Sequence, residues 1–329
     1  MSPFISVALC TYNGEKFLEQ QLTSILNQTM MVSEVVVFDD GSKDASLEIL
    51  QNFKASAPFP VLIHQNEKNL GSSKNFENCM AACQGEFIFL CDQDDIWDRH
   101  KVEKQIAYLN EHPDQDAVFS NAIMINQLGV PTGKTSFEQI EFVDELQDQW
   151  NKGFAFDLLL RGYIVTGATL AIRSKIIPEI LPVPQIIDEL IHDGWIAIYL
   201  SMNHRIGFLT DRLIKYREHA SQQVGLKGGG KTISLWERIT RNREKKLTKL
   251  KKKYVDSAAL CSYLSQKGNI SNEIIEKLEE RARHYSMRST LPDNRFKRFL
   301  PVLSAAFKGN YKLQDGGRWW DPVLGDLFE

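Results

Sequence analysis

The chain has 329 residues, of which 43% are hydrophobic, and this length predicts a large core divided between two structural units. Its formal net charge of −3 and its pI of about 6.2 argue against nucleic acid as a partner. No apolar run reaches the roughly 18 residues of a membrane span, and the N-terminus has no basic leader. We therefore expect a cytoplasmic protein whose five cysteines, which form no C-x-x-C pair, stay reduced.

The first half of the chain alternates short apolar runs with amphipathic segments. Apolar runs of this kind are typical of strands buried on both faces of a parallel sheet, and short connections favour right-handed crossovers. The sequence therefore predicts an α/β fold. Strands are predicted at 5–10, 34–38, 60–64 and 86–91, and helices at 17–26, 44–53, 73–83 and 101–112.

The pattern is weaker beyond residue 127. A further strand begins at 117–120, but 129–149 is polar, acidic and without a period, so we expect a mobile insertion or lid there. Regular structure is predicted to resume at 166–172, followed by a helix at 192–200 and a strand pair at 205–209 and 213–216.

A glycine run at 228–230 predicts a flexible joint, with a sheet domain at 1–225 and a helical C-terminal region at 226–329. Apolar side chains spaced by three and four predict one long amphipathic helix between Trp236 and Leu264. Residues 231–253 hold ten Lys or Arg against two Glu, a local charge of +8 against −11 for the rest of the chain. This basic helix fits an anionic membrane surface. A solvated face or a contact with the acidic sheet domain is the alternative.

Three carboxylates follow the fourth predicted strand within four residues: Asp92, Asp94 and Asp95. They stand at a strand's carboxyl end, where open α/β sheets bind ligands. Carboxylates this close raise one another's pKa unless a cation holds them together, and their hard oxygen atoms suit Mg²⁺ or Mn²⁺. The alternative is a capping loop, with Asp94 or Asp95 as the N-cap of the helix that begins near Lys101.

Several motifs together resemble the family 2 glycosyltransferases with a GT-A fold. The residues that carry this resemblance are Val7–Glu15, Val37–Asp44, Asn69–Asn75 and Asp92–Asp95. More narrowly, the chain resembles bacterial rhamnosyltransferase-like enzymes of surface polysaccharide synthesis at Asp92–Trp97, His192–Trp195 and Tyr216–His219. The resemblance covers residues 4–225. It implies a GT-A type, mostly parallel nucleotide-sugar-binding sheet flanked by helices.

The resemblance also implies a reaction and its partners. An inverting enzyme would move a sugar, with L-rhamnose as a candidate, from a UDP- or dTDP-linked donor to a glycan or lipid-linked acceptor. Such an enzyme would be cytoplasmic, with peripheral attachment at the inner face of the cell membrane as a further expectation.

The resemblance implies the following site residues. The nucleotide sugar would be held by Thr11, Tyr12, Asn13, Glu15, Asp40, Lys74 and Asp92. The divalent ion, Mn²⁺ or Mg²⁺, would be bound by Asp94 and Asp95, and His219 would add a ligand from a late loop. The pattern tends to have Asn where Gln222 stands. Lys74 could equally be an ordinary surface lysine at a helix start.

Asp193 occupies the position where this family places its catalytic base. An aromatic neighbour such as Trp195 would offer the sugar a stacking face and partly desolvate the carboxylate. The alternative is that Asp193 is an N-cap residue.

Three other functions compete with a transferase. A sugar-phosphate nucleotidyltransferase would need a glycine- and arginine-rich loop where this chain has Thr11–Glu15. A dinucleotide oxidoreductase would need G-x-G-x-x-G at the same place. A non-catalytic scaffold that binds nucleotide sugars is the third alternative, and the full set of carboxylates argues against it.

Overall fold

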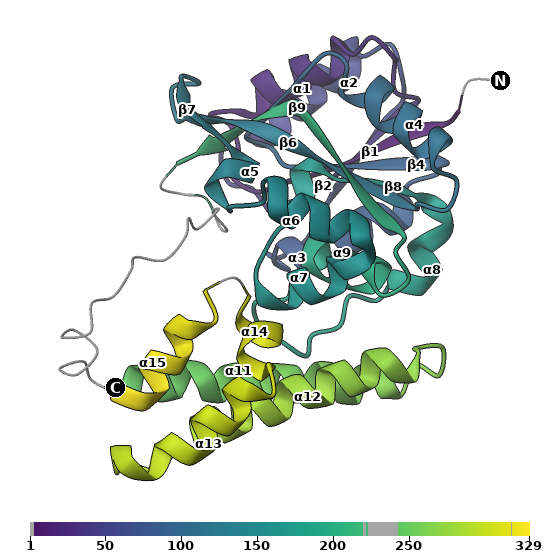
Figure 1. Ribbon diagram of the computed structural model, residues 1–329. Helices are drawn as coiled ribbons and strands as arrows, with labels where there is room; N and C mark the ends of the chain where they lie inside the picture. The colour runs from purple at the N-terminus through teal and green to yellow at the C-terminus, as the bar shows by residue number, and fades with distance from the viewer. Residues whose placement is uncertain (1–2, 220–221, 223–242, 317) are drawn as a thin grey trace. The chain divides into compact units, whose positions relative to one another are not determined.

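The computed structural model describes residues 3–219, 222, 243–316 and 318–329 (Figure 1). These residues form two compact units. The second unit contains 160–162, 185–190 and the described residues from 243 onward, and the first unit contains the others. The expected boundary after residue 225, the expected joint at 228–230 and the first turns of the expected basic helix lie outside the described residues.

A nine-stranded sheet forms the centre of the first unit, in the order β3-β2-β1-β4-β8-β6-β9-β5 with β7 beside β6. Strands β1 to β4 pair in parallel, as do β6 and β9, and β8 joins the two halves through antiparallel pairs. The predicted α/β fold with its mostly parallel sheet is confirmed. The strands are β1 Ile5–Thr11, β2 Glu34–Asp39, β3 Val61–Gln65, β4 Phe87–Cys91, β5 Ile96–Trp97, β6 Ala117–Asn126, β7 Pro131–Thr135, β8 Ala171–Arg173 and β9 Ile206–Glu218.

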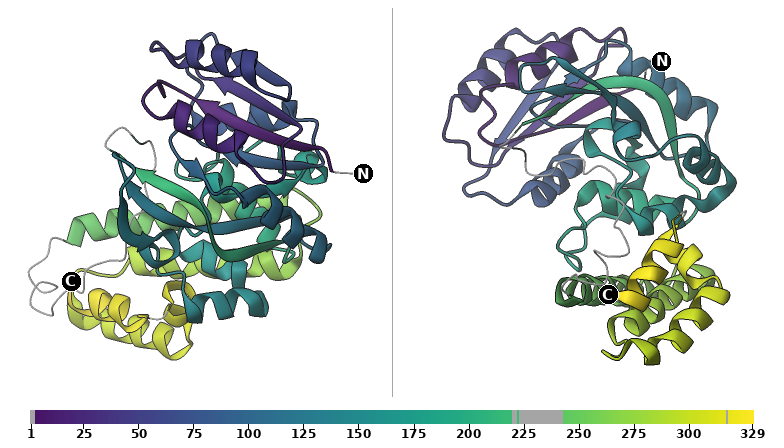
Figure 2. Two further views of the ribbon diagram at one scale, coloured as in Figure 1. Left: turned by 90° about the horizontal axis from the view of Figure 1, so that it is seen from above. Right: turned by 60° about the vertical axis from the view of Figure 1, so that its left-hand side comes forward.

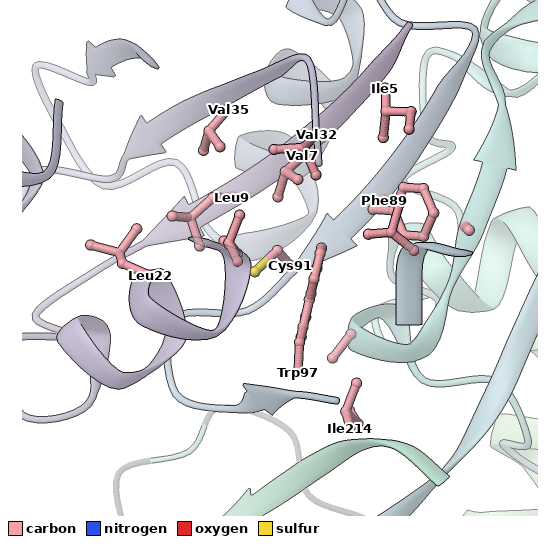
Figure 3. Close-up of a cluster of buried hydrophobic side chains, with 14 of the residues drawn as sticks. Ile5, Val7, Leu9, Leu22, Val32, Val35, Phe89, Cys91, Trp97 and Ile214 are labelled. Carbon is pink, nitrogen blue, oxygen red and sulfur yellow. The ribbon is translucent and has the colours of Figure 1, made fainter. Parts of the chain in front are cut away.

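Helices lie on both faces of this sheet (Figure 1). Every residue of β1 is buried, so its alternate side chains fill two different cores. On one face Val7 and Leu9 pack with Leu22 of α1 (Figure 3). The other face packs against α3. The helices of this unit are α1 Leu18–Leu26, α2 Ser46–Ser56, α3 Ser72–Ala82, α4 Lys101–Glu111, α5 Ser136–Gln139, α6 Asp144–Gln149, α7 Ala155–Arg161, α8 Ile177–Ile180 and α9 His192–Ser201.

The segment 129–149 has regular structure, so the prediction of a mobile insertion or lid without such structure is wrong. It forms β7, α5 and α6. Its few aromatic side chains explain the difference, because Phe137 and Phe142 pack edge to face at 5.0 Å and both contact Phe119 of β6. A polar sequence with no helical or strand period thus stays ordered around an aromatic cluster.

The predicted strand pair at 205–209 and 213–216 is also wrong, because β9 is a single strand. It pairs with β6 along its whole length, and the register shifts between Leu209 and Ile214. The irregularity accommodates the polar residues 210–212 between the two predicted strands without ending β9.

The second unit is helical, as predicted. Its two long helices, α11 and α12, lie side by side in every view (Figures 1 and 2). A small core of Val302, Tyr311 and Leu327 joins α13, α14 and α15. No helix among the residues described here is long and apolar enough to cross a membrane. The helices are α11 Arg243–Ser265, α12 Asn272–Ser289, α13 Arg295–Phe307, α14 Asn310–Asp315 and α15 Trp320–Phe328.

Candidate active site

A cavity of about 690 Å³ opens where β1, β2 and β4 end in the first unit. The carboxyl ends of parallel strands leave such a crevice because the connections turn away to opposite faces. Nine of the predicted site residues line it: Thr11, Tyr12, Asn13, Glu15, Asp40, Asp92, Asp94, Asp193 and His219. Two others, Lys74 and Asp95, do not.

The loop after β1 is held against the loop after β2 by side chains of both. The Lys43 amide donates to Asn13 Oδ1, and the Ala45 amide donates to Glu15 Oε2, each at 2.9 Å. In return the Asn13 amide donates to Ser42 Oγ at 2.9 Å. Asn13 and Glu15 therefore shape the wall of the cavity as well as line it.

The two neighbouring carboxylates at the end of β2 do different work. Asp39 is fully buried and accepts hydrogen bonds from Thr11 Oγ1 and the Ser42 amide, each at 2.9 Å. Asp40 accepts from the amides of Leu70 and Gly71 at 2.8 and 2.9 Å. Asp39 thus stabilises the turn in which it lies. Asp40 stabilises the loop before α3 and also lines the cavity.

Gln93 connects the acidic loop to the loop after β1. Its Oε1 accepts from the Tyr12 amide at 2.8 Å, and its Nε2 donates to the Tyr12 carbonyl at 3.0 Å. A side-chain amide can pair with a backbone in this way because it carries one acceptor and one donor side by side. The sequence motif contained Gln93 but gave no hint of this role.

The carboxylates after β4 do not cap a helix, so that alternative is wrong. The short strand β5 intervenes, and the N-cap of α4 is His100. Asp94 Oδ2 lies 2.8 Å from His219 Nε2 on the cavity wall. Burial, followed by the charges of Asp94 and Asp193, raises the pKa of Asp92 to about 8. Asp92 therefore lies among carboxylates, and their charges oppose its ionisation.

Asp95 lies behind the cavity wall, beneath Arg217. Its Oδ1 accepts from the Arg217 amide at 2.9 Å, and the guanidinium donates to the Asp94 carbonyl and to Gln20 Oε1, each at 2.7 Å. Burial and the neighbouring charges of Asp94 and Asp92 raise the pKa of Asp95 well above its usual range. Arg217 thus ties β9, α1 and the acidic loop together.

Asp193 is the second residue of α9, whose N-cap is Ile191, so the N-cap alternative is wrong. Its Oδ2 accepts from the Gly167 amide at 2.8 Å, and its Oδ1 accepts from the Tyr163 hydroxyl. Burial and the charge of Asp193 raise the pKa of Tyr163 well above its usual range, so this hydroxyl stays a donor. These bonds hold the carboxylate in one orientation at the cavity.

Trp195 offers no face to a sugar, contrary to the expectation from the sequence. It is fully buried, and its indole donates to the Ile180 carbonyl at 2.8 Å. Other aromatic groups line the cavity, among them Tyr163 and the stacked pair of Phe76 and His192, whose ring centroids are 4.1 Å apart. Tyr12, Phe17 and Tyr216 line it as well. A helical period carries Trp195 to the core side of α9 while leaving Asp193 on the cavity side.

Lys74 lies on the exposed side of α3. It forms an ion pair with Glu77, whose Oε2 accepts from the Val183 amide at 2.9 Å. This position fits the alternative interpretation of Lys74 as a surface lysine at the start of a helix.

The described residues fit a divalent cation in part. No three His, Cys, Asp or Glu side chains in the part of the chain described here converge on a complete metal site. Asp94 and His219, however, present an oxygen and a nitrogen 2.8 Å apart on the cavity wall. Such a pair suits a cation that takes its remaining ligands from phosphate oxygens and water.

Residues 6–178 match the family model described as Glycosyl transferase family 2, which is more than half of the chain. The chain belongs to this glycosyltransferase family. An uncharacterized protein of Mycobacterium bovis is 28% identical over 221 residues, covering 66% of this chain and 59% of the relative. This chain thus spans about three-fifths of the length of that relative. The dTDP-rhamnosyl transferase RfbG of Shigella flexneri is 28% identical over 280 residues, covering 81% of this chain and 91% of the relative.

Two solved structures share the fold. TarS 1–349 of S. aureus in complex with UDP-GlcNAc has a TM-score of 0.53 and 18% identity, covering 95% of this chain and 89% of that one. The mannosyltransferase PcManGT of Pyrobaculum calidifontis in complex with GDP-Man and Mn²⁺ has a TM-score of 0.52 and 16% identity, covering 99% and 85%. The fold is therefore GT-A-like.

Proposed function

We propose that this chain is an inverting, metal-dependent hexosyltransferase that uses a nucleoside diphosphate sugar. The observation that carries the proposal is that one cavity brings together the Asp94–His219 pair, the carboxylate of Asp193 and the loops after β1 and β2. A divalent cation held by Asp94 and His219 would neutralise the charge of the leaving diphosphate. Asp92, whose ionisation the neighbouring carboxylates oppose, would lie beside it.

The acceptor hydroxyl would lose its proton to Asp193. The hydroxyl oxygen then forms the new bond to the anomeric carbon as the bond to the diphosphate oxygen breaks, with inversion at that carbon. The hydrogen bonds from Tyr163 and the Gly167 amide hold the carboxylate while its remaining lone pairs accept the proton.

We further propose a dTDP-linked donor, with L-rhamnose as the first sugar to test and a UDP-linked donor as the second candidate. The likeness to RfbG, which extends over 91% of that protein, supports this order. A glycan or lipid-linked acceptor in cell-surface polysaccharide synthesis would follow from the same likeness. A lipid-linked acceptor would favour peripheral attachment to the cell membrane.

The test is release of nucleoside diphosphate from a panel of dTDP-, UDP- and GDP-sugars, with Mn²⁺, with Mg²⁺ and with a chelator. Asp94→Ala should reduce turnover to background and weaken Mn²⁺-dependent binding of the nucleoside diphosphate by about tenfold or more. His219→Ala should cause a smaller loss of the same kind. Asp98→Ala is the matched control, because Asp98 follows β5 only four residues after Asp94 but is exposed and does not line the cavity.

Three outcomes would count against the proposal. Full metal-dependent binding in the Asp94 variant would remove the metal site. Release of pyrophosphate from a nucleoside triphosphate and a sugar phosphate would support a nucleotidyltransferase. Tight nucleotide binding without turnover of any donor would support a scaffold.

A further inference from the structure

Helix α13 of the second unit carries apolar side chains on two of its faces. On the inner face Val302 and Ala305 are buried against Tyr311 and Leu327. On the outer face Phe296, Leu300 and Phe307 are 87%, 82% and 89% exposed. Several large apolar side chains are seldom exposed next to one another, because burying each Leu or Phe side chain would be strongly favourable.

The outer side chains form one continuous stripe. They follow one another by four, three and four residues through Phe296, Leu300, Leu303 and Phe307, a spacing that keeps them on the same side of a helix. We call these four residues the α13 stripe. Scattered exposed apolar side chains are normal on a protein surface, but a stripe along three turns indicates a binding surface.

The charge along the stripe itself is positive. Residues 295–314 contain five Lys or Arg and no Asp or Glu. Of these cations Arg298 is buried, where it donates to the Pro292 carbonyl at 2.6 Å and so holds the start of the helix. Arg295, Lys297 and Lys308 are exposed beside the stripe. The acidic residues that flank residues 295–314, Asp293 and Asp315, form ion pairs with Arg243 and Arg288.

We propose, building on the membrane-proximal function above, that the α13 stripe docks this chain on the surface of an anionic lipid bilayer. Phe296, Leu300 and Phe307 would enter the boundary between headgroups and acyl chains, and the flanking cations would contact lipid phosphates. A second copy of the chain is a poorer partner. Two α13 stripes facing each other would bring like charges together without an acidic residue between 295 and 314 to pair with them.

The basic helix α11 is less suited to this task than its sequence suggests. Lys246 forms ion pairs with Asp326 at 2.9 Å and Glu329 at 3.5 Å, and Lys252 forms one with Glu189 at 2.9 Å. Lys253 lies over the ring of Tyr285, 5.0 Å from its centroid. Three of its lysines therefore contact groups of the same unit, which leaves α13 as the better membrane surface.

The experiment is co-sedimentation of the full chain with phosphatidylcholine vesicles, with and without about 30% phosphatidylglycerol, in the absence of donor. Replacing Phe296→Ser, Leu300→Ser and Phe307→Ser together should weaken binding to the anionic vesicles by about 100-fold or more. Replacing Arg295→Gln, Lys297→Gln and Lys308→Gln should weaken it by about 100-fold and leave the weak binding to neutral vesicles unchanged.

Two matched controls separate this surface from others. Leu128→Ser with Val130→Ser removes exposed apolar side chains from the β6–β7 turn, and Lys245→Gln with Lys249→Gln and Lys251→Gln removes exposed cations from α11. Both should bind vesicles within about threefold of the wild type. Circular dichroism checks that each variant is folded. If the triple Ser variant does not fold, the triple Gln variant still tests the proposal.

Binding that is unchanged in both α13 variants would overturn the proposal. So would loss of binding in the α11 control alone, or a dimer that the α13 variants convert to a monomer without any vesicle binding. Transfer to a water-soluble acceptor is measured separately, so failure at the membrane and failure of the transferase chemistry remain distinguishable.

Discussion

Two groups of buried carboxylates, one in each unit, have opposite surroundings. In the acidic loop of the first unit, Asp92 lines the cavity and Asp95 lies behind its wall, and burial and the charges of neighbouring carboxylates raise the pKa of both. In the second unit, Asp326 accepts from Arg288 Nε at 2.6 Å and lies 2.9 Å from Lys246 Nζ. Although burial raises the pKa of Asp315, the hydrogen bond from His284 and the charge of Arg288 lower it to about 2.

The difference separates two uses of buried charge. Carboxylates surrounded by cations are satisfied within the fold, so they contribute to one packed arrangement of helices. Carboxylates that repel one another cost stability, and that cost is relieved only when a ligand brings positive charge. We therefore expect the carboxylates of the first unit to serve ligand binding, whereas those of the second unit stabilise the packing of its helices.

The largest effect should come from removing the cation of the structural group. Arg288→Gln leaves Asp315 and Asp326 buried without their main partner and should lower the free energy of unfolding of the second unit by about 3–5 kcal/mol. Hydrogen exchange of the α12 amides measures this loss in that unit alone. Arg283→Gln is the control, because Arg283 pairs with Glu279 at 3.3 Å on the exposed side of the same helix. Similar protection in the two variants would contradict the role given to Arg288.

The next largest effect should come from the proposed base. Asp193→Asn keeps the shape of the side chain but removes its basicity, so turnover should fall by roughly 100-fold or more while donor binding stays nearly intact. It should also lower the free energy of unfolding by about 1–3 kcal/mol, less than Arg288→Gln, because the amide nitrogen of Asn cannot accept the hydrogen bond of a backbone amide. Tyr163→Phe removes only one hydrogen bond to Asp193 and should reduce turnover by about tenfold. Near-normal turnover in the Asn variant would mean that the base is another residue.

Acid should weaken the second unit through Asp315. Its pKa in the folded chain lies below the unfolded value of 3.8, so its contribution is fully present above pH 4 and is lost as the pH falls towards about 2. The loss should be on the order of 2 kcal/mol. Hydrogen exchange or urea unfolding between pH 5 and about 2 would show it. Asp315→Asn should flatten this pH dependence, and an unchanged dependence would assign it to other groups.

The smallest expected effect is a gain in stability rather than a loss. Asp92→Asn removes a repelling charge from the cavity and should raise the stability of the metal-free chain by about 1 kcal/mol at pH 8. The same variant should bind nucleoside diphosphate with Mn²⁺ less tightly. Thermal unfolding with and without Mn²⁺ tests both effects, with the exposed Asp98→Asn as control. A lower melting temperature in the metal-free variant would show that Asp92 is a structural carboxylate like Asp315.

The sequence predicted most of the first half-sheet because the signal there is local. Val35–Val37 is fully buried in β2, and a strand covered on both faces must be apolar at every position. The position of the acidic loop followed from the same argument, since strand ends of a parallel sheet meet at one edge.

Other parts of the site depend on contacts between distant residues, which a local pattern does not contain. Arg217 meets Asp95 across 122 positions of the chain, and Tyr163 meets Asp193 across 30. Tyr163 stands in no motif, and the motif Tyr216–His219 that contains Arg217 gave no sign of its contact with Asp95. The ordered segment 129–149 was missed for a related reason, because Phe137 and Phe142 are too few to set a period but sufficient to form a cluster with Phe119.

The two hydrogen bonds between the Gln93 side chain and the Tyr12 backbone, called the Gln93 clasp below, restrict which residues can replace Gly14. A β-carbon at Gly14 would overlap the Gln93 side-chain amide, so a larger residue at 14 would displace Gln93 from its hydrogen bonds with the Tyr12 backbone. Relatives that carry Gln at the position of Gln93 should have glycine at the position of Gly14, and relatives with a larger residue at 14 should have a smaller one at 93. Aligned relatives in which the two positions vary freely would show that the Gln93 clasp is not a constraint shared by descent.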